Sequence, residues 1–262
     1  MSKFTFDDKL THPGPTQKEV SKTLGQLKTS STCILHTYQA LALWRGKRPS
    51  EHKRGFYGVP YASLKLLEIE NKIINDDPYA DALYLMIENR ITSAQEHNNQ
   101  QNEQLHFQVV NKLNDSFSFS KSISINPISI ELNFKCPLAY KLVHLITIID
   151  QYVRTLITLK HIGEMSSKEC SAKAEKAANS YRSIIALVQR FDYTKTITRW
   201  DVVKKTSLAD ELKNQFEWIN LTDDMLKRIN RATTAPEPTV DTIKIPPAIP
   251  SEILPPVPQK QP

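Results

Sequence analysis

Glycine is scarce in this sequence, with six residues in 262, the last of them Gly163. The glycine-rich loops that hold phosphates in nucleotide enzymes, GxGxxG and GxxxxGK[ST], do not occur. The three cysteines are an odd number, which would leave a disulfide scaffold with a spare thiol and fits a reducing compartment better. These shortages argue against a nucleotide-binding enzyme and against a disulfide-rich secreted domain.

Signals for export and for membrane insertion are also missing. Residues 1–8 lack the apolar core of a secretory signal. The longest uncharged apolar stretch, between Lys141 and Asp150, is far shorter than the ~18 to 20 residues that span a bilayer. Apolar residues make up 40% and charged residues 24%, which is usual for a globular chain with a buried core. We therefore expect a cytoplasmic protein that does not contact a membrane.

Metal-binding and catalytic spacings are not found either. The seven histidines and three cysteines form neither CxxC nor HExxH, so we predict no metal and no cofactor. Cys136 is expected between a strand and a helix, where helix amides can lower the pKa of a thiol. No motif places a histidine beside it to act as base. An enzyme with Cys136 as nucleophile is therefore a weak alternative.

Four regions can be distinguished along the chain. We predict a flexible N-terminus at 1–15, a helical region at 16–114, a second folded region at 115–235 and a disordered proline-rich tail at 236–262. The stretch from Ala235 to Pro262 holds 9 of the 16 prolines, so neither a helix nor a paired strand can continue through it. The tail is either a solvated end or a docking strand for a proline-binding partner.

The region 16–114 has the apolar spacing of helices. One helical pattern runs from about residue 16 to Trp44, and a short second helix ends before Asp76. Its apolar face consists of Leu64, Leu67, Ile73 and Ile74. A long helix is expected from Pro78, with Asp77 as its N-cap. Residues 95–104 include no apolar side chain, so this part of the long helix is predicted to be solvated or frayed.

The apolar period changes to two at Phe117, where apolar residues and serines alternate as far as Ile125. This pattern predicts a half-buried strand. The phase slips at Asn126-Pro127, so a break is required there, and the segment from Ile128 to Phe134 is the better strand.

A long helix is expected from Pro137, with apolar residues nearly all round it. Either the rest of the chain or a second subunit must cover such a helix. Gly163 ends it, and Ser166 or Ser167 caps the next helix, which runs to Phe191. Two further helices are predicted, one from a capping box at Thr198 to just before Trp218 and a short one from Thr222 to about Arg231.

A basic loop follows the first helical pattern. Between residues 45 and 54, five basic residues face one acidic residue, Glu51, which gives a local net charge of +4. The basic residues are Arg45, Lys47, Arg48, Lys53 and Arg54. Such a density suits contacts with DNA phosphates, although a solvated loop remains an alternative.

The strand, helix, turn and helix from Ile128 to Phe191 resemble a ribbon-helix-helix arrangement. Side chains alternate along a strand, so the polar residues of this strand would face outward together. These are Ser129, Glu131, Asn133 and Lys135. A two-stranded ribbon with one strand from each subunit fits the major groove of DNA, where such side chains meet base edges, while Ser166 and Ser167 offer helix amides to a phosphate. The same succession of elements also occurs in ordinary α+β domains.

Five segments together resemble a known family. They are residues 43–47 (LWRGK), 76–81 (DDPYAD), 149–154 (IDQYVR), 161–163 (HIG) and 198–202 (TRWDV). They are similar to the AcaB-like transcriptional activators of integrating conjugative elements and conjugative plasmids, over about residues 30–235. The resemblance implies a bacterial, dimeric ribbon-helix-helix protein that activates promoters of conjugative transfer, with the ribbon at 128–135 and the turn at 163–167.

These observations together predict a mainly α, multi-helix protein with a short β-ribbon, a ribbon-helix-helix-like homodimer without catalysis. Ser129, Glu131, Asn133 and Lys135 would read bases, and the basic loop with Ser166 and Ser167 would contact phosphates. Its partners would be double-stranded promoter DNA and a second copy of the chain, with RNA polymerase as a further candidate. The alternative is a non-enzymatic accessory or structural protein of DNA processing or conjugative transfer.

Overall fold

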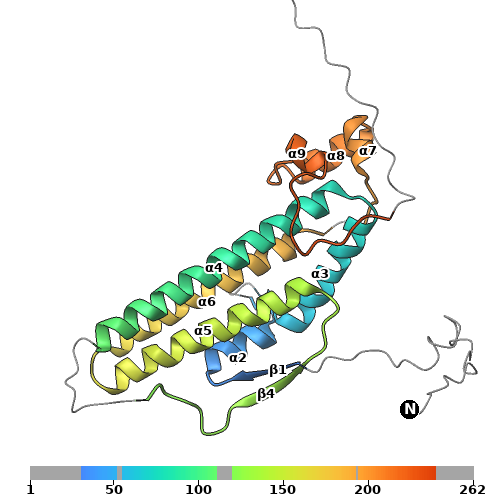
Figure 1. Cartoon of the computed structure of the whole chain (residues 1–262). Helices are drawn as coiled ribbons and strands as arrows, with labels where there is room; N and C mark the ends of the chain where they lie inside the picture. Colours follow the sequence, from blue (N-terminus) through green and yellow to red (C-terminus); the bar gives the residue numbers. More distant parts are fainter. Residues whose placement is uncertain (1–30, 52–54, 111–119, 193, 240–262) are drawn as a thin grey trace, which may run out of the picture. The chain divides into compact units, whose positions relative to one another are not determined.

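The computed structural model describes residues 31–51, 55–110, 120–192 and 194–239, with the backbone alone at 108–110. Within these residues the chain is mainly helical, with eight helices and two small two-stranded sheets (Figure 1). The predicted helical class is therefore confirmed. The segment predicted to be a flexible N-terminus and nearly all of the predicted tail lie outside the described residues. One core cluster takes residues from both the 16–114 and the 115–235 regions.

The described chain begins with a strand, β1 (Ser31–Leu35). The predicted helix that ends at Trp44 is therefore wrong for these positions. Cys33 and Leu35 are buried, whereas Ile34 is 52% exposed, which is the alternation of a strand. The β-branched residues of this segment also favour extended backbone, and β1 gains a partner strand from a distant part of the chain.

Helix α2 (Tyr38–Arg45) starts beside a buried carboxylate of a later helix. Thr37 donates from its backbone nitrogen and its hydroxyl to Oδ1 of Asp150, at 2.8 and 2.7 Å. The backbone nitrogen of His36 donates to the same carboxylate at 3.2 Å. Asp150 is 2% exposed, so these bonds replace its hydration and fix the corner between β1 and α2.

Helices α3 (Val59–Ile74) and α4 (Pro78–Val110) follow the predicted order. Oδ1 of Asp77 accepts from the backbone nitrogens of Tyr79 and Ala80, at 2.9 and 3.1 Å. The predicted N-cap with proline at the first helical position is thereby confirmed. The predicted face of α3 is wrong at Leu64, which is 59% exposed.

The polar segment 95–104 is helical throughout, so it is not frayed, but six of its ten side chains are exposed, as predicted for a solvated segment. Others contact neighbouring helices. Asn98 is 2% exposed and donates to Oγ of Ser180 at 3.3 Å. Asn102 accepts from the Thr155 hydroxyl at 2.7 Å. Polar side chains can be buried at these helix contacts because each finds a partner on the facing helix.

Strand β4 (Ile128–Leu132) pairs with β1. The preceding residues 120–125 are not a strand, contrary to prediction, and Ile123 and Ile125 are 69% and 97% exposed. Hydrogen bonds with side chains, rather than with a paired strand, position the backbone of this segment. Ser122 donates from its backbone nitrogen to the Thr158 hydroxyl at 2.8 Å. The predicted break near Pro127 is confirmed by the change from coil to strand.

Helices α5 (Pro137–His161) and α6 (Ser167–Arg190) confirm the predicted helix, turn and helix. Gly163 takes a positive φ of 81° in the turn, which favours glycine. Helix α5 is long and apolar enough to cross a membrane by composition alone, but most of it is buried inside the protein. Contacts with α2, α3, α4 and α6 cover it, so its own chain supplies the enclosure that its apolar surface requires.

Three short helices follow α6: α7 (Arg199–Val203), α8 (Ser207–Gln215) and α9 (Asp223–Leu226). The capping box of Thr198 and Asp201 is present as predicted. The single helix predicted to run on to Trp218 is wrong, because Lys205 takes a positive φ of 52° and breaks it. The next helix then begins with Thr206 as its N-cap.

Residues 228–239, which we call the C-terminal strap, run from α9 back across the start of α4. The Thr233 and Thr234 hydroxyls donate to Oε1 of Glu88, at 2.8 and 3.0 Å. The backbone nitrogen of Thr239 donates to the carbonyl of Ile74 at 3.1 Å. The strap therefore joins the C-terminal elements to α3 and α4.

Candidate nucleic-acid interface

The four residues predicted to read bases, Ser129, Glu131, Asn133 and Lys135, are all exposed. The residues between them are more buried, with Leu132 9% exposed. However, β4 ends at Leu132, so Asn133 and Lys135 lie beyond the strand. The backbone nitrogen of Phe134 donates to the Tyr140 hydroxyl at 3.3 Å rather than to a strand partner. The predicted alternation is therefore present, but the predicted ribbon is too long by three residues.

An aromatic contact joins this segment to the end of α2. The ring of Phe134 lies 6.2 Å from that of Trp44 and 5.5 Å from that of Tyr140, measured between centroids. Trp44 immediately precedes Arg45, the first residue of the basic loop. Phe134 itself lies between Asn133 and Lys135, so the structure brings the end of the polar strand face close to the start of the basic loop.

The basic loop forms a hairpin of two short strands, β2 (Gly46–Lys47) and β3 (Phe56–Tyr57). They are antiparallel, with Gly46 opposite Tyr57 and Lys47 opposite Phe56. Arg45, Lys47 and Arg48 are exposed. Lys53 and Arg54 lie outside the described residues.

Glycines allow this hairpin to approach α2. A Cβ at Gly58 would lie 2.3 Å from the carbonyl oxygen of Trp44, and one at Gly46 would lie 2.2 Å from the nitrogen of Gly58. Both neighbouring atoms are backbone, so neither can move aside easily. Gly46 also has a positive φ of 75°. Two of the six glycines are therefore required to position the basic residues.

Helix α6 supports the other side of the hairpin. The Tyr181 hydroxyl donates to the carbonyl of Tyr57 at 3.3 Å, and the guanidinium of Arg182 lies 5.4 Å from the ring centre of Phe56. Burial raises the pKa of Tyr181, so its hydroxyl stays protonated and can donate. A hollow of about 670 Å³ is left between the hairpin and α6, lined by Arg45, Lys47, Arg48, Tyr61 and Gln189 among others.

Ser166 and Ser167 lie at the other end of α5. The side chain of Ser166 accepts from the backbone nitrogen of Glu169 at 3.2 Å, so Ser166 is the N-cap of α6. Both serines are exposed. The 25 residues of α5 span about 37 Å between this cap and the segment that ends at Lys135. The structure therefore does not bring the predicted phosphate site at the serines together with the basic hairpin.

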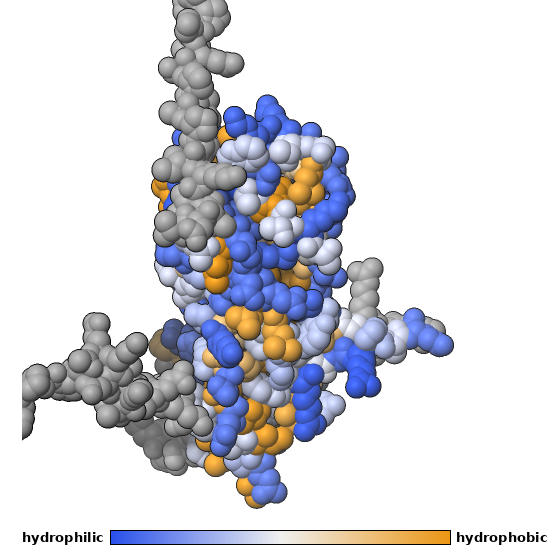
Figure 2. All heavy atoms as spheres, turned by 90° about the vertical axis from the view of Figure 1, so that its right-hand side faces the viewer, coloured by the Kyte–Doolittle hydropathy of each residue, from blue (hydrophilic) through white to orange (hydrophobic). Residues whose placement is uncertain are grey.

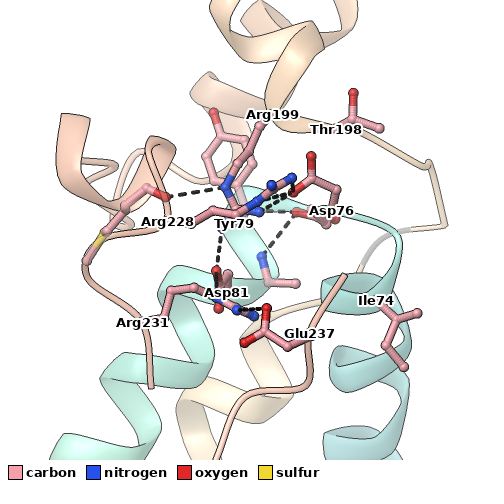
Figure 3. Close-up of polar contacts among 12 residues, drawn as sticks. Ile74, Asp76, Tyr79, Asp81, Thr198, Arg199, Arg228, Arg231 and Glu237 are labelled. Atoms are coloured by element: carbon pink, nitrogen blue, oxygen red, sulfur yellow. Dashed lines mark hydrogen bonds and ion pairs between the residues drawn. The ribbon is translucent and has the colours of Figure 1, made fainter. Parts of the chain in front are cut away.

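Sequence reasoning missed a buried cluster of charges at the start of α4, shown in Figure 3. Arg199 forms ion pairs with both Asp76 and Asp81, and all three side chains are at most 4% exposed. Arg228 pairs with Asp76 at 2.7 Å, and Arg231 pairs with Asp81 at 2.9 Å. Among Asp76, Asp77 and Asp81, the sequence had predicted a role only for Asp77, as the N-cap of α4. Three aspartates lie next to apolar residues at the start of this helix. Carboxylates in such a position indicate that a cationic side chain is buried with them.

Comparison with known proteins identifies the family. The family described as "Transcriptional regulator AcaB" matches residues 23–237. The chain belongs to the AcaB family of transcriptional regulators. Among solved structures, the crystal structure of selenomethionine-containing AcaB from uropathogenic E. coli is similar, with 16% identity and a TM-score of 0.49, and the match covers 77% of this chain and 98% of that one. No curated protein matches significantly.

Membership of the AcaB family implies DNA binding and a non-enzymatic role. Several of the segments on which the resemblance rests form structural contacts in this AcaB-family chain. Asp76 and Asp81 meet Arg199 in the buried charge cluster, and Asp150 holds the corner before α2. The segment 43–47 includes the tight junction at Gly46. These residues of the segments therefore form contacts that define the fold.

The alternative enzyme at Cys136 finds no support in the geometry. Burial, together with the nearby Glu70 carboxylate, raises the pKa of this thiol to about 12. The thiol is thus protonated and only 1% exposed, which is the state of an inert core cysteine. Within the described residues, no group of three or more His, Cys, Asp or Glu side chains is arranged to hold a metal ion.

Proposed function

We propose that this AcaB-family regulator is a homodimeric activator of conjugative transfer genes on a mobile element, and that it reads promoter DNA with the polar face of β4 and the residues after it. Ser129, Glu131, Asn133 and Lys135 would contact base edges in the major groove. Asn pairs with adenine, Lys with guanine, and Glu accepts from the amine of cytosine. The observation that carries the proposal is the exposure of all four side chains next to an exposed basic hairpin.

Phosphate contacts would come first from the hairpin. Arg45, Lys47 and Arg48 are exposed, and the ring contact between Trp44 and Phe134 links them to the base-reading segment. Phosphate contacts orient a protein on the duplex, whereas base contacts provide specificity. Lys53 and Arg54 extend the same basic loop in sequence. Ser166 and Ser167 would reach a separate stretch of the DNA backbone, since α5 spans about 37 Å between them and the segment that ends at Lys135.

A second subunit is now proposed on the basis of β4 and no longer on the basis of the apolar surface of α5. Helix α5 is covered by its own chain, and β4 already pairs with β1. Among the described residues, β4 pairs with β1 only, so its other edge remains available to a strand of a second copy. Ile128 on β4 and Ile125 just before it are exposed apolar residues that such a dimer would cover. Sedimentation at micromolar concentration should show a dimer, and a stable monomer both alone and on DNA would contradict an intermolecular ribbon.

Binding to genomic fragments, followed by sequencing, would first identify the promoter sequence. Asn133→Ala and Lys135→Ala should each remove about 1–3 kcal/mol of discrimination between this promoter and random DNA, with unchanged melting temperatures. Leu132→Ala and Phe134→Ala are the matched controls from the same segment. They remove packing and should lower stability by about 2–4 kcal/mol.

The two pairs of variants distinguish residues that read bases from residues that stabilise the fold. If Asn133→Ala and Lys135→Ala still select the promoter as well as the parent protein does, the segment after β4 is not the reader. A purified protein that selects no genomic fragment at all would favour the accessory role in DNA processing or transfer.

A further inference from the structure

A second cavity lies away from the proposed DNA interface, among the short C-terminal helices. It has a volume of about 650 Å³ and is lined by residues of α4, α7, α8 and α9. This volume lies within the range of about 300–1,000 Å³ that is usual for small-molecule sites. Figure 2 shows the face of the molecule whose upper part carries these helices, with hydrophobic surface there framed by hydrophilic side chains. Nothing in the proposed DNA-reading function uses this cavity.

The uncharged side chains that line the cavity are mostly apolar, and the polar groups among them are the amides of Asn214 and Asn220 and the hydroxyl of Tyr79. Val202, Ile219, Leu221 and Leu226 line it together with Tyr79. Tyr79 is 3% exposed, and no hydrogen bond joins its hydroxyl to another described residue. Burial raises the pKa of Tyr79, and the charges of Asp77 and Asp210 raise it further. The wall therefore offers an apolar surface with one protonated hydroxyl that can donate to a ligand.

The rim carries charges of both signs. Asp210 and Lys213 are one turn apart on α8, so they share a face of that helix, and Glu217 follows just beyond its end. Lys205 completes the charged rim. Within the described part of the chain, none of these four side chains forms an ion pair. Two cations and two anions are thus free to meet opposite charges on a ligand.

We propose that this cavity binds a small zwitterion with an apolar body, the chemistry of a short hydrophobic peptide with both termini free. The ligand carboxylate would meet Lys205 and Lys213, and its ammonium group would meet Asp210 and Glu217. The aliphatic side chains would contact Val202, Leu226 and the other apolar residues of the wall. A purely anionic or purely cationic ligand fits less well, because half of the rim would repel it.

The dipeptide Leu-Leu serves as the probe, with its N-acetylated and C-amidated forms as matched ligands that each lack one charge. Titration calorimetry on the full chain should give a Kd for Leu-Leu below about 1 mM, as expected for a ligand of its size. Both capped forms should bind at least about tenfold more weakly. At 10 mM, Leu-Leu should raise the melting temperature by about 3 °C.

Variants of the rim test the site itself. Lys213→Gln and Glu217→Gln change exposed side chains and should fold normally, and each should weaken Leu-Leu binding about tenfold. Lys204→Gln is the matched control, because Lys204 is exposed on the same part of the chain and does not line the cavity. It should bind as the parent does. The proposal is overturned by the absence of saturable binding up to 10 mM, by equal affinity for the capped peptides, or by equal losses in all three variants.

Discussion

Arg199 and Asp81 are 118 positions apart in the sequence, yet they form a buried ion pair in which each side chain is 4% exposed. The same guanidinium bonds to Asp76 at 2.5 Å and donates from Nε to the carbonyl of Met225 at 3.3 Å. One side chain therefore connects the start of α4 to α7 and α9. A planar guanidinium presents separate nitrogens in a fixed geometry to two carboxylates and a carbonyl, whereas the ammonium group of lysine has a single nitrogen for all three.

Substitution of Arg199 should be among the most destabilising single changes in the chain. Arg199→Met leaves Asp76 and Asp81 buried with fewer positive partners, and we expect a loss of about 3–5 kcal/mol in the free energy of unfolding. Lys195→Met is the matched control, because its ion pair with Glu211 is about half exposed on both sides. That change should cost about 1 kcal/mol or less. Urea denaturation of both variants measures the difference, and similar losses would contradict a special role for Arg199.

The stability of the protein should depend on the ionisation of Asp77. Burial raises the pKa of its carboxyl group to about 7, although hydrogen bonds from Ala80 and Tyr79 and the charge of Lys72 act in the opposite direction. An acid with a raised pKa in the folded state binds its proton more tightly there than in the unfolded chain. Stability contributed by this group is therefore full below about pH 4 and falls as the pH rises towards 7.

Asp77→Asn removes this titration and keeps an oxygen that can accept at the helix N-terminus. The free energy of unfolding of the parent should fall by up to about 4 kcal/mol relative to that of the variant between pH 4 and pH 8. Chemical denaturation across this range gives both curves. Parallel curves would show that Asp77 ionises without cost in the folded protein.

The hairpin glycines should tolerate substitution less well than Gly163. Gly58→Ala places a methyl group against the backbone oxygen of Trp44, whereas a Cβ at Gly163 meets no atom within 4 Å. Gly163→Ala should cost about 1 kcal/mol, for its positive φ alone. Gly58→Ala should cost at least about twice as much and should also weaken DNA binding by displacing Arg45 and Lys47. Melting curves and DNA titrations of the two variants test this order.

Salt should weaken DNA binding strongly if the hairpin contacts phosphates. With roughly six to ten phosphate contacts from two subunits, affinity should fall about 10³ to 10⁵-fold between 50 and 200 mM salt. The triple variant Arg45→Gln, Lys47→Gln and Arg48→Gln should bind with a shallower salt dependence. Titrations at several salt concentrations give both slopes, and an unchanged slope would remove the hairpin from the interface.

Sequence patterns predicted the helical part of the fold well, because long apolar periodicity and caps are local signals. Asp77, Ser166 and the capping box at Thr198 all have their predicted roles. The strand β1 was missed because its partner β4 lies about 95 residues further along the chain. Likewise, nothing near Asp76 indicates that its partners are Arg199 and Arg228.

The sequence also predicted part of the candidate interface. Alternation predicted the exposure of Ser129, Glu131, Asn133 and Lys135, which the structure shows. It did not predict the ring contact of Phe134 with Trp44, because ring contacts between distant segments leave no periodic pattern in the sequence. The separation between the Ser166 cap and the segment that ends at Lys135 follows from the length of α5, which the sequence did indicate.

The C-terminal strap has a consequence for biosynthesis. Asp76, Asp81 and Glu88 leave the ribosome early, whereas their partners Arg228, Arg231 and Thr233 are made about 150 residues later. During synthesis these acidic side chains must remain hydrated, because no cation from the strap exists yet to accompany them into the interior. The start of α4 can therefore reach its final packing only after the strap has been synthesised.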